Sequence, residues 1–164
     1  MLTKTIANKN IAYVVGHVED ESKNVAIVVI AKPTLDIVRG ISALQRKLKT
    51  ILIQNNNYGS FYIHFLSPIV NRAESEASEH VMIRNLKLYE DSINKKANKN
   101  GVNTDVIVAW GNKGCENLMY IPCLYLATKS KARVLCFGMT AEGAPKDPTY
   151  VRINQMLLPY ESIE

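Results

Sequence analysis

Short apolar runs separated by segments with helical spacing set the pattern of this chain. Residues 25 to 31 (V-A-I-V-V-I-A) and 106 to 109 (V-I-V-A) are uninterrupted apolar runs. Such runs are typical of strands that are buried on both faces of a parallel sheet. Residues 11 to 16, 61 to 66 and 133 to 138 are also predicted to be strands. The first two strands along the chain are placed to pair as a hairpin.

The segments between these strands favour helices. From Leu35 to Leu52 the apolar residues recur every three or four positions, and further helical patterns lie between residues 81 and 93 and after residue 118. Alternating strands and helices imply parallel strands joined by crossovers. The sequence therefore predicts an α/β fold, a three-layer α/β/α sandwich with a mainly parallel central sheet, and a single domain over residues 1–164.

Composition narrows the class of protein. The 164 residues are 47% hydrophobic and 21% charged, which is usual for one soluble globular domain. No apolar run approaches the roughly 20 residues of a membrane span, and no targeting segment is visible at the N-terminus, so we expect a cytoplasmic protein without membrane association. Cys115, Cys123 and Cys136 lack the spacing of a disulfide framework or metal site. We predict reduced thiols, no metal and no cofactor.

The stretch T-D-V-I-V-A-W-G-N-K-G, residues 104 to 114, indicates where a site lies. An apolar strand there ends in a glycine-rich turn that we expect to start a helix, and helix starts favour anions. In parallel sheets, ligands collect beyond the carboxyl ends of the strands. The residues leaving those ends are the predicted ligand-binding set: Lys32, Pro33, Trp110, Gly111, Asn112, Lys113, Lys146, Pro148 and Tyr150.

This set suits an anionic partner with aromatic bases. The three lysines add positive charge, while Trp110 and Tyr150 offer stacking faces. The net charge of +5 and the pI of about 9.1 also favour approach to a nucleotide or nucleic acid. Some of these residues have purely structural interpretations as well. Trp110 could plug the end of the sheet, Asp147 before Pro148 could cap a turn, and His64 could be a packing residue inside its strand.

Several loops carry a family resemblance. The segments A-W-G-N-K-G at 109 to 114 and V-L-C-F-G-M-T-A-E-G-A-P-K-D-P-T-Y at 134 to 150 resemble the bacterial and phage family known as domain of unknown function 1643 (DUF1643). A weaker match, V-I-A-K-P-T-L-D, lies at 29 to 36. The pattern of that family is similar to that of uracil-DNA glycosylases, so the resemblance implies a uracil-DNA glycosylase-like fold.

The resemblance also bears on chemistry. In uracil-DNA glycosylases the first loop positions a water, and a late histidine polarises the departing base. Here Lys32, His64 and Asp147 stand at the positions of the first-loop Asn, the middle Asn and the late His. A charged lysine accepts no hydrogen bond from water, and an ionised aspartate donates none to a base. We therefore expect binding without standard glycosylase chemistry.

Three functions remain open at this point. The favoured one is a protein that binds a nucleotide, nucleobase or nucleic acid. The second is an enzyme with rearranged groups, in which Asp36 or Asp147 is a base and Lys32 or His64 an electrophilic helper. The third is a protein–protein interaction module on the same fold. A cluster of Lys32, His64, Asp147 and Trp110 around one pocket would favour the first two, and dispersal of these residues would favour the third.

Overall fold

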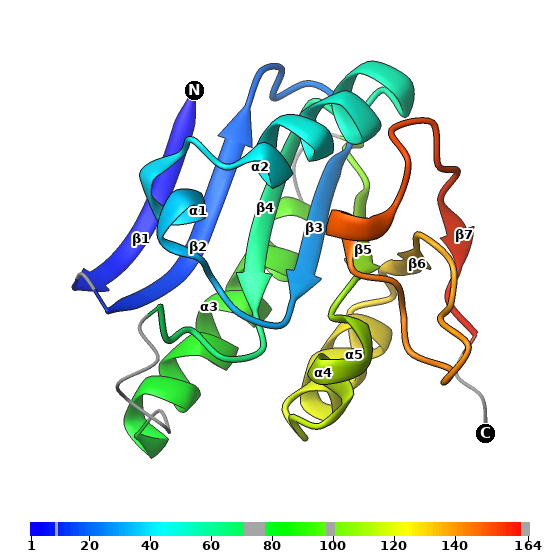
Figure 1. The fold of residues 1–164 in the computed structure, drawn as a ribbon. Helices are drawn as coiled ribbons and strands as arrows, with labels where there is room; N and C mark the ends of the chain where they lie inside the picture. The colour runs from blue at the N-terminus through cyan, green and yellow to red at the C-terminus, as the bar shows by residue number, and fades with distance from the viewer. Residues whose placement is uncertain (9, 71–77, 98–100, 162–164) are drawn as a thin grey trace.

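The computed structural model describes residues 1–8, 10–70, 78–97 and 101–161. They form an α/β fold with a seven-stranded mixed sheet and five α-helices (Figure 1). The strands are β1 (Leu2–Asn8), β2 (Ile11–Val18), β3 (Val25–Ile30), β4 (Ser60–Phe65), β5 (Thr104–Val108), β6 (Arg133–Cys136) and β7 (Leu158–Pro159). The helices are α1 (Leu35–Arg39), α2 (Ala43–Leu48), α3 (Glu79–Ala97), α4 (Gly111–Cys115) and α5 (Tyr120–Lys129), with a π-helix η1 (Lys49–Asn55) and a 3₁₀ helix η2 (Pro148–Tyr150).

Strand β3 is the centre of the sheet. All six of its residues are buried, and it pairs in parallel with β4 on one side and β5 on the other. A strand covered on both faces has no position for a polar side chain, which explains the unbroken apolar run. Strand β6 adds a third parallel pairing, to β5. The predicted parallel strands are therefore present at the centre.

The prediction that the sheet is mainly parallel is wrong. The strand order is β1-β2-β4-β3-β5-β6-β7, and the pairings β1–β2, β2–β4 and β6–β7 are antiparallel. The predicted hairpin between β2 and β3 is also wrong, because β4 lies between them and β2 forms its hairpin with β1. The antiparallel pairings lie toward the edges of the sheet. No long apolar run in the sequence marks them.

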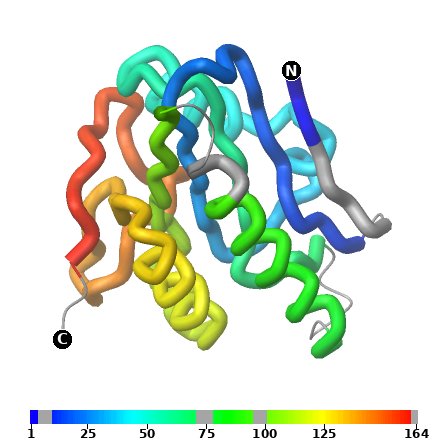
Figure 2. The backbone as a smooth tube through the Cα atoms, turned by 180° about the vertical axis from the view of Figure 1, so that it is seen from behind, coloured from blue at the N-terminus to red at the C-terminus, as the bar shows by residue number. Residues whose placement is uncertain are grey.

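Helices lie on both faces of the sheet (Figures 1 and 2). On one face, Ile37 of α1, Leu48 of α2 and Ile51 of η1 join the core cluster that contains Val28. On the opposite face, α3 and α5 pack on the cluster that contains Ile27. Because the side chains of a strand alternate between faces, β3 contributes to both clusters.

The predicted helix over residues 35 to 52 is broken into three pieces. Gly40 takes a left-handed φ of 78° and ends α1, and its N–H donates to Ile37 O. Ser42 then starts α2 with a capping box that includes Gln45. The helical segment continues through η1 to Asn55. Spacing of apolar positions continues across the break and so does not reveal it.

Three further sequence predictions concern membrane spans, metal binding and the cysteines. In the described residues no helix is long and apolar enough to cross a membrane. The same residues contain no group of three or more His, Cys, Asp or Glu side chains placed to hold a metal ion. The three cysteines are free thiols, and Cys123 and Cys136 are buried. Burial raises the pKa of the Cys123 thiol to about 12, so this side chain stays a neutral part of the core.

A buried carboxylate joins the beginning of β5 to its neighbours. Asp105, with a side chain only 4% exposed, accepts hydrogen bonds from Arg133 Nε at 3.1 Å and Nη2 at 2.7 Å. It also accepts a hydrogen bond of 2.6 Å from the Tyr58 hydroxyl. Burial and the bond to Asp105 raise the pKa of Tyr58 above its ordinary value. These bonds hold β6 and the connection before β4 against β5.

Replacing Asp105 should therefore be costly. In Asp105→Ala the Tyr58 hydroxyl and the Arg133 guanidinium lose their shared acceptor, and we expect the free energy of unfolding to fall by about 2–4 kcal/mol. Urea denaturation followed by circular dichroism measures this change. Asp91→Ala is the control, because Asp91 belongs to an exposed ion pair with Lys87 and its loss should cost roughly 0.5 kcal/mol or less. Equal losses in the two variants would contradict the role given to Asp105.

Candidate functional site

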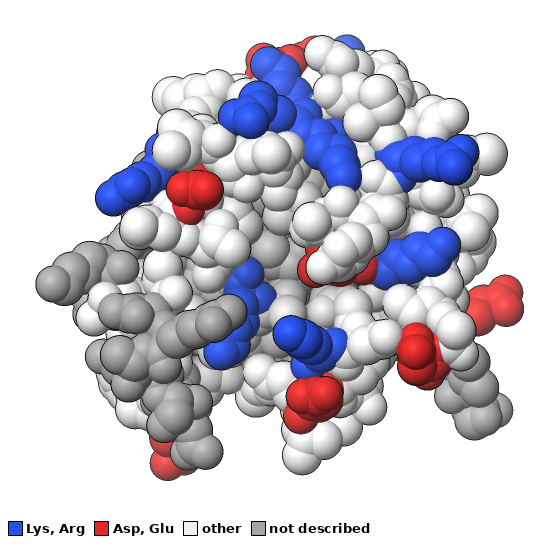
Figure 3. Space-filling model, viewed as in Figure 1, with Lys and Arg blue, Asp and Glu red and all other residues white. Residues whose placement is uncertain are grey.

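The carboxyl ends of β3, β5 and β6 meet around an open pocket of about 550 Å³. Its lining residues are Ala31, Trp110, Gly111, Asn112, Lys113, Thr140, Lys146, Asp147 and Tyr150. Six of these belong to the ligand-binding set predicted from sequence, and Asp147 was predicted as a candidate catalytic base; Ala31 and Thr140 were not predicted. Figure 3 shows several Lys and Arg side chains around the hollowed centre of the face seen in Figure 1. The structure thus brings much of the predicted set together, and its binding role stays a prediction.

The pocket occupies the point where the order of the strands reverses. From β3 the chain passes to β4 on one side, and the later strands β5 and β6 lie on the other side of β3. The loops that leave β3 and β5 therefore diverge at their carboxyl ends. In open α/β sheets this divergence creates the crevice in which ligands bind.

Gly111 allows the loops after β5 and β6 to approach each other. Its φ of +68° is a left-handed value that favours glycine, and a Cβ at this position would lie 3.3 Å from Asp147 Cβ. The Gly111 N–H donates to Pro145 O at 2.9 Å. The turn leads into a helix as predicted, but this helix, α4, has only five residues. Because its first N–H is already bonded within the protein, we assign no anion to this helix start.

Asn112 braces the loop after β6. Its side-chain oxygen accepts a hydrogen bond of 2.6 Å from the Thr140 hydroxyl, and its Nδ2 donates to Glu142 Oε2 at 2.8 Å. Thr140 Oγ1 also accepts from the Ala144 N–H at 3.1 Å. The bond from Asn112 holds the pKa of the Glu142 carboxyl below its ordinary value, so the acceptor stays ionised. Asn112 thus fixes one wall of the pocket.

The opposite wall, η2, is held by a lysine that sequence reasoning missed. Lys47 Nζ of α2 donates to the carbonyl oxygens of Thr149 at 2.7 Å, Val151 at 3.1 Å and Pro148 at 3.3 Å. Asp147 Oδ1 accepts from the Thr149 N–H at 2.8 Å and caps η2, as its structural interpretation predicted. An ammonium has three donors, and here all three find acceptors. No local pattern marks Lys47, because lysines are common on polar helix faces.

Three predicted side chains of the pocket remain available to a ligand. Lys113 and Lys146 are exposed, and the ring of Tyr150 is part of a residue that is 87% exposed. Lys146 extends over Gly138, whose φ is +102°, and a Cβ at Gly138 would lie 3.7 Å from Lys146 Cδ. The pocket therefore presents two cations and an aromatic face to the solvent.

Trp110 lies in the pocket lining, but its ring is buried rather than open to a stacking base. The residue is 1% exposed, and its indole packs against Tyr120 and Tyr160 at centroid distances of 5.7 and 6.5 Å. A buried ring offers no face to a base. The geometry matches the alternative in which Trp110 plugs the end of the sheet.

Other predicted residues lie outside the pocket lining. Lys32 is exposed and Pro33 buried just beyond Ala31, and Pro148 is buried at the start of η2. Asp36 is exposed in the first turn of α1. His64 is buried in β4, where its ring meets the Tyr89 ring edge-on at 5.5 Å. Of the four residues whose clustering would favour a binding site or an enzyme, only Trp110 and Asp147 line the pocket.

The contacts of Lys47 yield a stability prediction. Lys47→Met keeps most of the aliphatic stem but removes the donor shared by three carbonyls, so we expect the free energy of unfolding to fall by about 1–3 kcal/mol. Urea denaturation gives the value. Lys113→Met is the matched control, because this exposed side chain has no ion pair among the described residues and should change stability by roughly 0.5 kcal/mol or less. Indistinguishable variants would refute the anchoring role.

Comparison with known proteins adds no relative. No protein-family model, curated protein or solved structure matches this chain. The similarity to DUF1643 and to uracil-DNA glycosylases therefore rests on the sequence motifs alone, and the functional argument rests on the pocket.

Proposed function

We propose that the protein binds a nucleotide, a nucleobase or a nucleic acid in the pocket between α4 and η2. The observation that carries this proposal is the placement of Lys113, Lys146 and Tyr150 around one pocket. An ammonium group is a common partner of phosphate. An exposed aromatic ring is a stacking surface for any base. These are the two chemical parts of a nucleotide.

Size and charge support the same class of ligand. A volume of about 550 Å³ lies in the range of pockets that hold small organic molecules. Two lysines outweigh the single carboxylate of Asp147, so the lining favours an anion. Asp147 Oδ1 is used by the Thr149 N–H, which leaves Oδ2 to accept from a base or sugar donor.

The positions of the polar groups favour binding over glycosylase chemistry. Lys32 and His64 do not line the pocket, and Asp147 serves as the cap of η2. The resemblance would require an acceptor that positions a water and a donor that polarises the base. The pocket lining lacks both groups at the positions to which the resemblance assigns them. A divergent enzyme is the alternative, and it is supported by one observation: Asp147 shares the pocket with Lys113 and Lys146, a carboxylate and ammonium pair suited to acid–base work.

We infer a three-layer, uracil-DNA glycosylase-like arrangement and membership of DUF1643 from the sequence motifs. The helices on both faces of the sheet support the layered part of this inference.

A protein-interaction role is the second alternative. Ile121 and Tyr125, four residues apart on α5, and Leu118 in the turn just before it are each more than half exposed. Exposed apolar side chains gathered at the start of a helix suit contact with another protein. This face is separate from the pocket lining, so the two functions are distinguishable by mutation.

We expect nucleotides or short single-stranded DNA to raise the melting temperature of the purified protein. Lys113→Ala and Lys146→Ala should each raise the dissociation constant about fivefold or more, because each removes one charge next to the phosphate. Calorimetric titration measures the affinity. Lys87→Ala, a change to an exposed lysine on α3, is the charge-matched control and should bind normally. No thermal shift with any nucleotide or DNA in a broad panel would rule out the proposed ligand class.

Uracil-containing DNA tests the chemical part of the proposal. We expect no release of uracil, measured by chromatography of the free base, because the groups needed to activate water and polarise the base are displaced. Release that is abolished by Asp147→Ala or Asp36→Ala, and preserved in Asp91→Ala, would establish the enzyme alternative.

A further inference from the structure

The ring of Tyr150, in the lining of the pocket between α4 and η2, is uncovered on both faces. The residue is 87% exposed, and within the described part of the chain no ring or cation packs against it. A ring that packs one face on the protein loses much of its exposed area. The backbone under the ring is nevertheless held, because Lys47 Nζ bonds to the carbonyl oxygens of Thr149 and Val151 on either side. Tyr150 therefore offers two stacking faces from a fixed position.

A free nucleotide uses only one of these faces, because it carries a single base. In a single strand the neighbouring base can cover the other face, since successive unpaired bases stack on aromatic side chains. The bases of a duplex are already paired and stacked on one another, so they are not free to do this. The second open face of Tyr150 therefore favours a strand of unpaired nucleotides over a mononucleotide.

Two cations lie just beyond the pocket lining. Lys32 follows Ala31, which lines the pocket at the end of β3, and Arg152 comes two residues after Tyr150. Both are exposed, and in the part of the chain that the structure describes neither forms an ion pair. They leave the pocket on different segments of the chain, and Figure 3 shows basic side chains on several sides of the hollow. A strand has phosphates beyond the bound nucleotide for such cations, and a mononucleotide has none.

The carboxylates of this edge are mostly engaged with the protein. Glu142 accepts a hydrogen bond from the turn after β5, and Asp147 caps η2. Asp36 is exposed in the first turn of α1. These three carboxylates are outnumbered by the cations on the segments around the pocket, which are Lys32, Lys113, Lys146 and Arg152. The edge therefore keeps an excess of positive charge for a polyanion.

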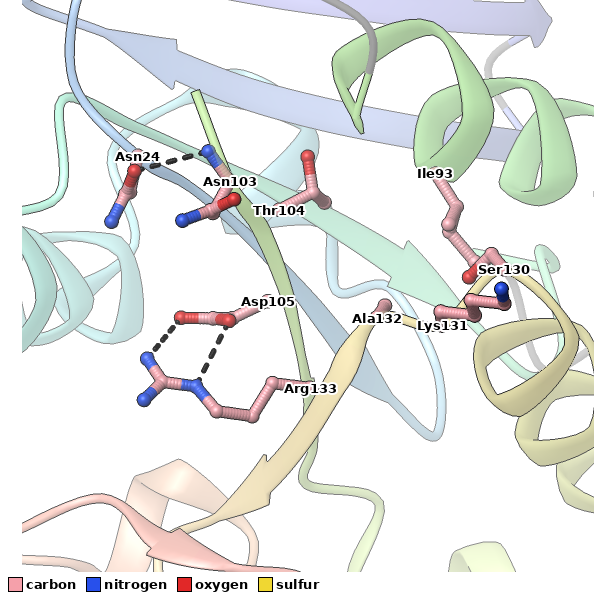
Figure 4. A pocket seen from close by; sticks show the side chains of 9 residues that line it. All are labelled: Asn24, Ile93, Asn103, Thr104, Asp105, Ser130, Lys131, Ala132 and Arg133. Carbon is pink, nitrogen blue, oxygen red and sulfur yellow. Dashed lines mark hydrogen bonds and ion pairs between the residues drawn. The ribbon is translucent and has the colours of Figure 1, made fainter. Parts of the chain in front are cut away.

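The other large cavity lacks this combination. It has a volume of about 470 Å³ and lies at the opposite edge of the sheet, where β5 and β6 begin (Figure 4). The Arg133 guanidinium there is held on Asp105, which balances its charge. Its described lining residues include no aromatic ring. Lys131, exposed beside Ser130 in this lining, supplies a control cation far from the stacking ring.

We infer that the pocket holds one nucleotide of a single-stranded nucleic acid, an inference that rests on the proposed function of the same pocket. The base of that nucleotide stacks on one face of Tyr150, and the neighbouring base stacks on the other. Lys32 and Arg152 neutralise phosphates beyond the bound nucleotide. Phosphates and stacking faces are common to DNA and RNA, so the inference concerns the chemistry that the two share.

A comparison of chain lengths tests this inference. Calorimetric titration compares a single-stranded oligonucleotide of about five nucleotides with its constituent nucleoside monophosphates. We expect the oligonucleotide to bind about 100-fold more tightly, because it adds a stacked base and two neutralised phosphates. The oligonucleotide is made as DNA and as RNA, and the tighter of the two identifies the sugar that the protein prefers.

The outcomes of this comparison separate the inference from the proposed function. Monophosphates that bind as tightly as the oligonucleotide would overturn the inference and leave the nucleotide pocket in place. A duplex of the same sequence that binds as tightly as the single strand would also overturn it. Binding by neither monophosphates nor oligonucleotide would remove the proposed function itself.

The flanking cations are tested by the salt dependence of binding. Lys32→Gln and Arg152→Gln should each raise the dissociation constant of the oligonucleotide about threefold and lower the slope of log affinity against log salt by about 0.7. The monophosphates should be affected by a smaller factor, because both side chains lie outside the pocket lining. Lys131→Gln is the charge-matched control and should leave the slope unchanged. A slope that changes equally in the control would exclude a contact between these cations and the strand.

Two changes at Tyr150 test the stacking ring. Tyr150→Phe keeps the ring and should bind the oligonucleotide normally, whereas Tyr150→Ala should weaken binding about tenfold or more. The side chain is exposed, so both variants should keep the melting temperature of the unmodified protein. Tyr150→Ala should weaken oligonucleotide binding by a larger factor than monophosphate binding, because two bases lose their stacking partner. Equal factors would mean that the ring holds one base only, and the inferred strand would be wrong.

Discussion

The complete burial of β3 is the constraint on which the rest of the structure depends. All six of its side chains are buried, five of them in the two core clusters, and its backbone is bonded to a parallel strand on each side. Helices must therefore cover both faces, and the chain must cross over the sheet to return in the same direction. One result is local to the pocket: the Ala109 N–H bonds to Val29 O at 2.9 Å, so the turn after β5 begins beside the loop after β3.

The pocket divides its residues into those that hold its shape and those that remain for a ligand. Gly111, Asn112 and Lys47 are engaged with neighbouring loops through backbone or side-chain bonds. Lys113 and Tyr150 stay exposed on the walls that these contacts fix. A ligand that meets prearranged walls loses less of its binding free energy to ordering the protein. The bracing contacts therefore matter to recognition even though they do not touch the ligand.

The sequence predicts those parts of the protein that depend on local pattern. The run V-A-I-V-V-I-A supplies β3 because a strand buried on both faces accepts only apolar side chains. The turn after β5 lies at the pocket because parallel strands share one carboxyl edge. The mixed edges of the sheet depend on pairing between distant segments. Likewise, the sequence does not show whether Lys47 faces solvent or carbonyl oxygens, or whether the Trp110 indole faces solvent or other rings. Only tertiary structure decides between these.

The reach of Lys47 has a consequence for how the protein is made. Its ammonium is separated by 101 to 104 residues of chain from the three carbonyls that it binds. During synthesis the N-terminal strands and helices emerge long before residue 151, and the ammonium has no acceptor there until η2 has been translated. The pocket is consequently a property of the finished chain, and a truncated product with an intact central sheet would still lack the wall that carries Tyr150.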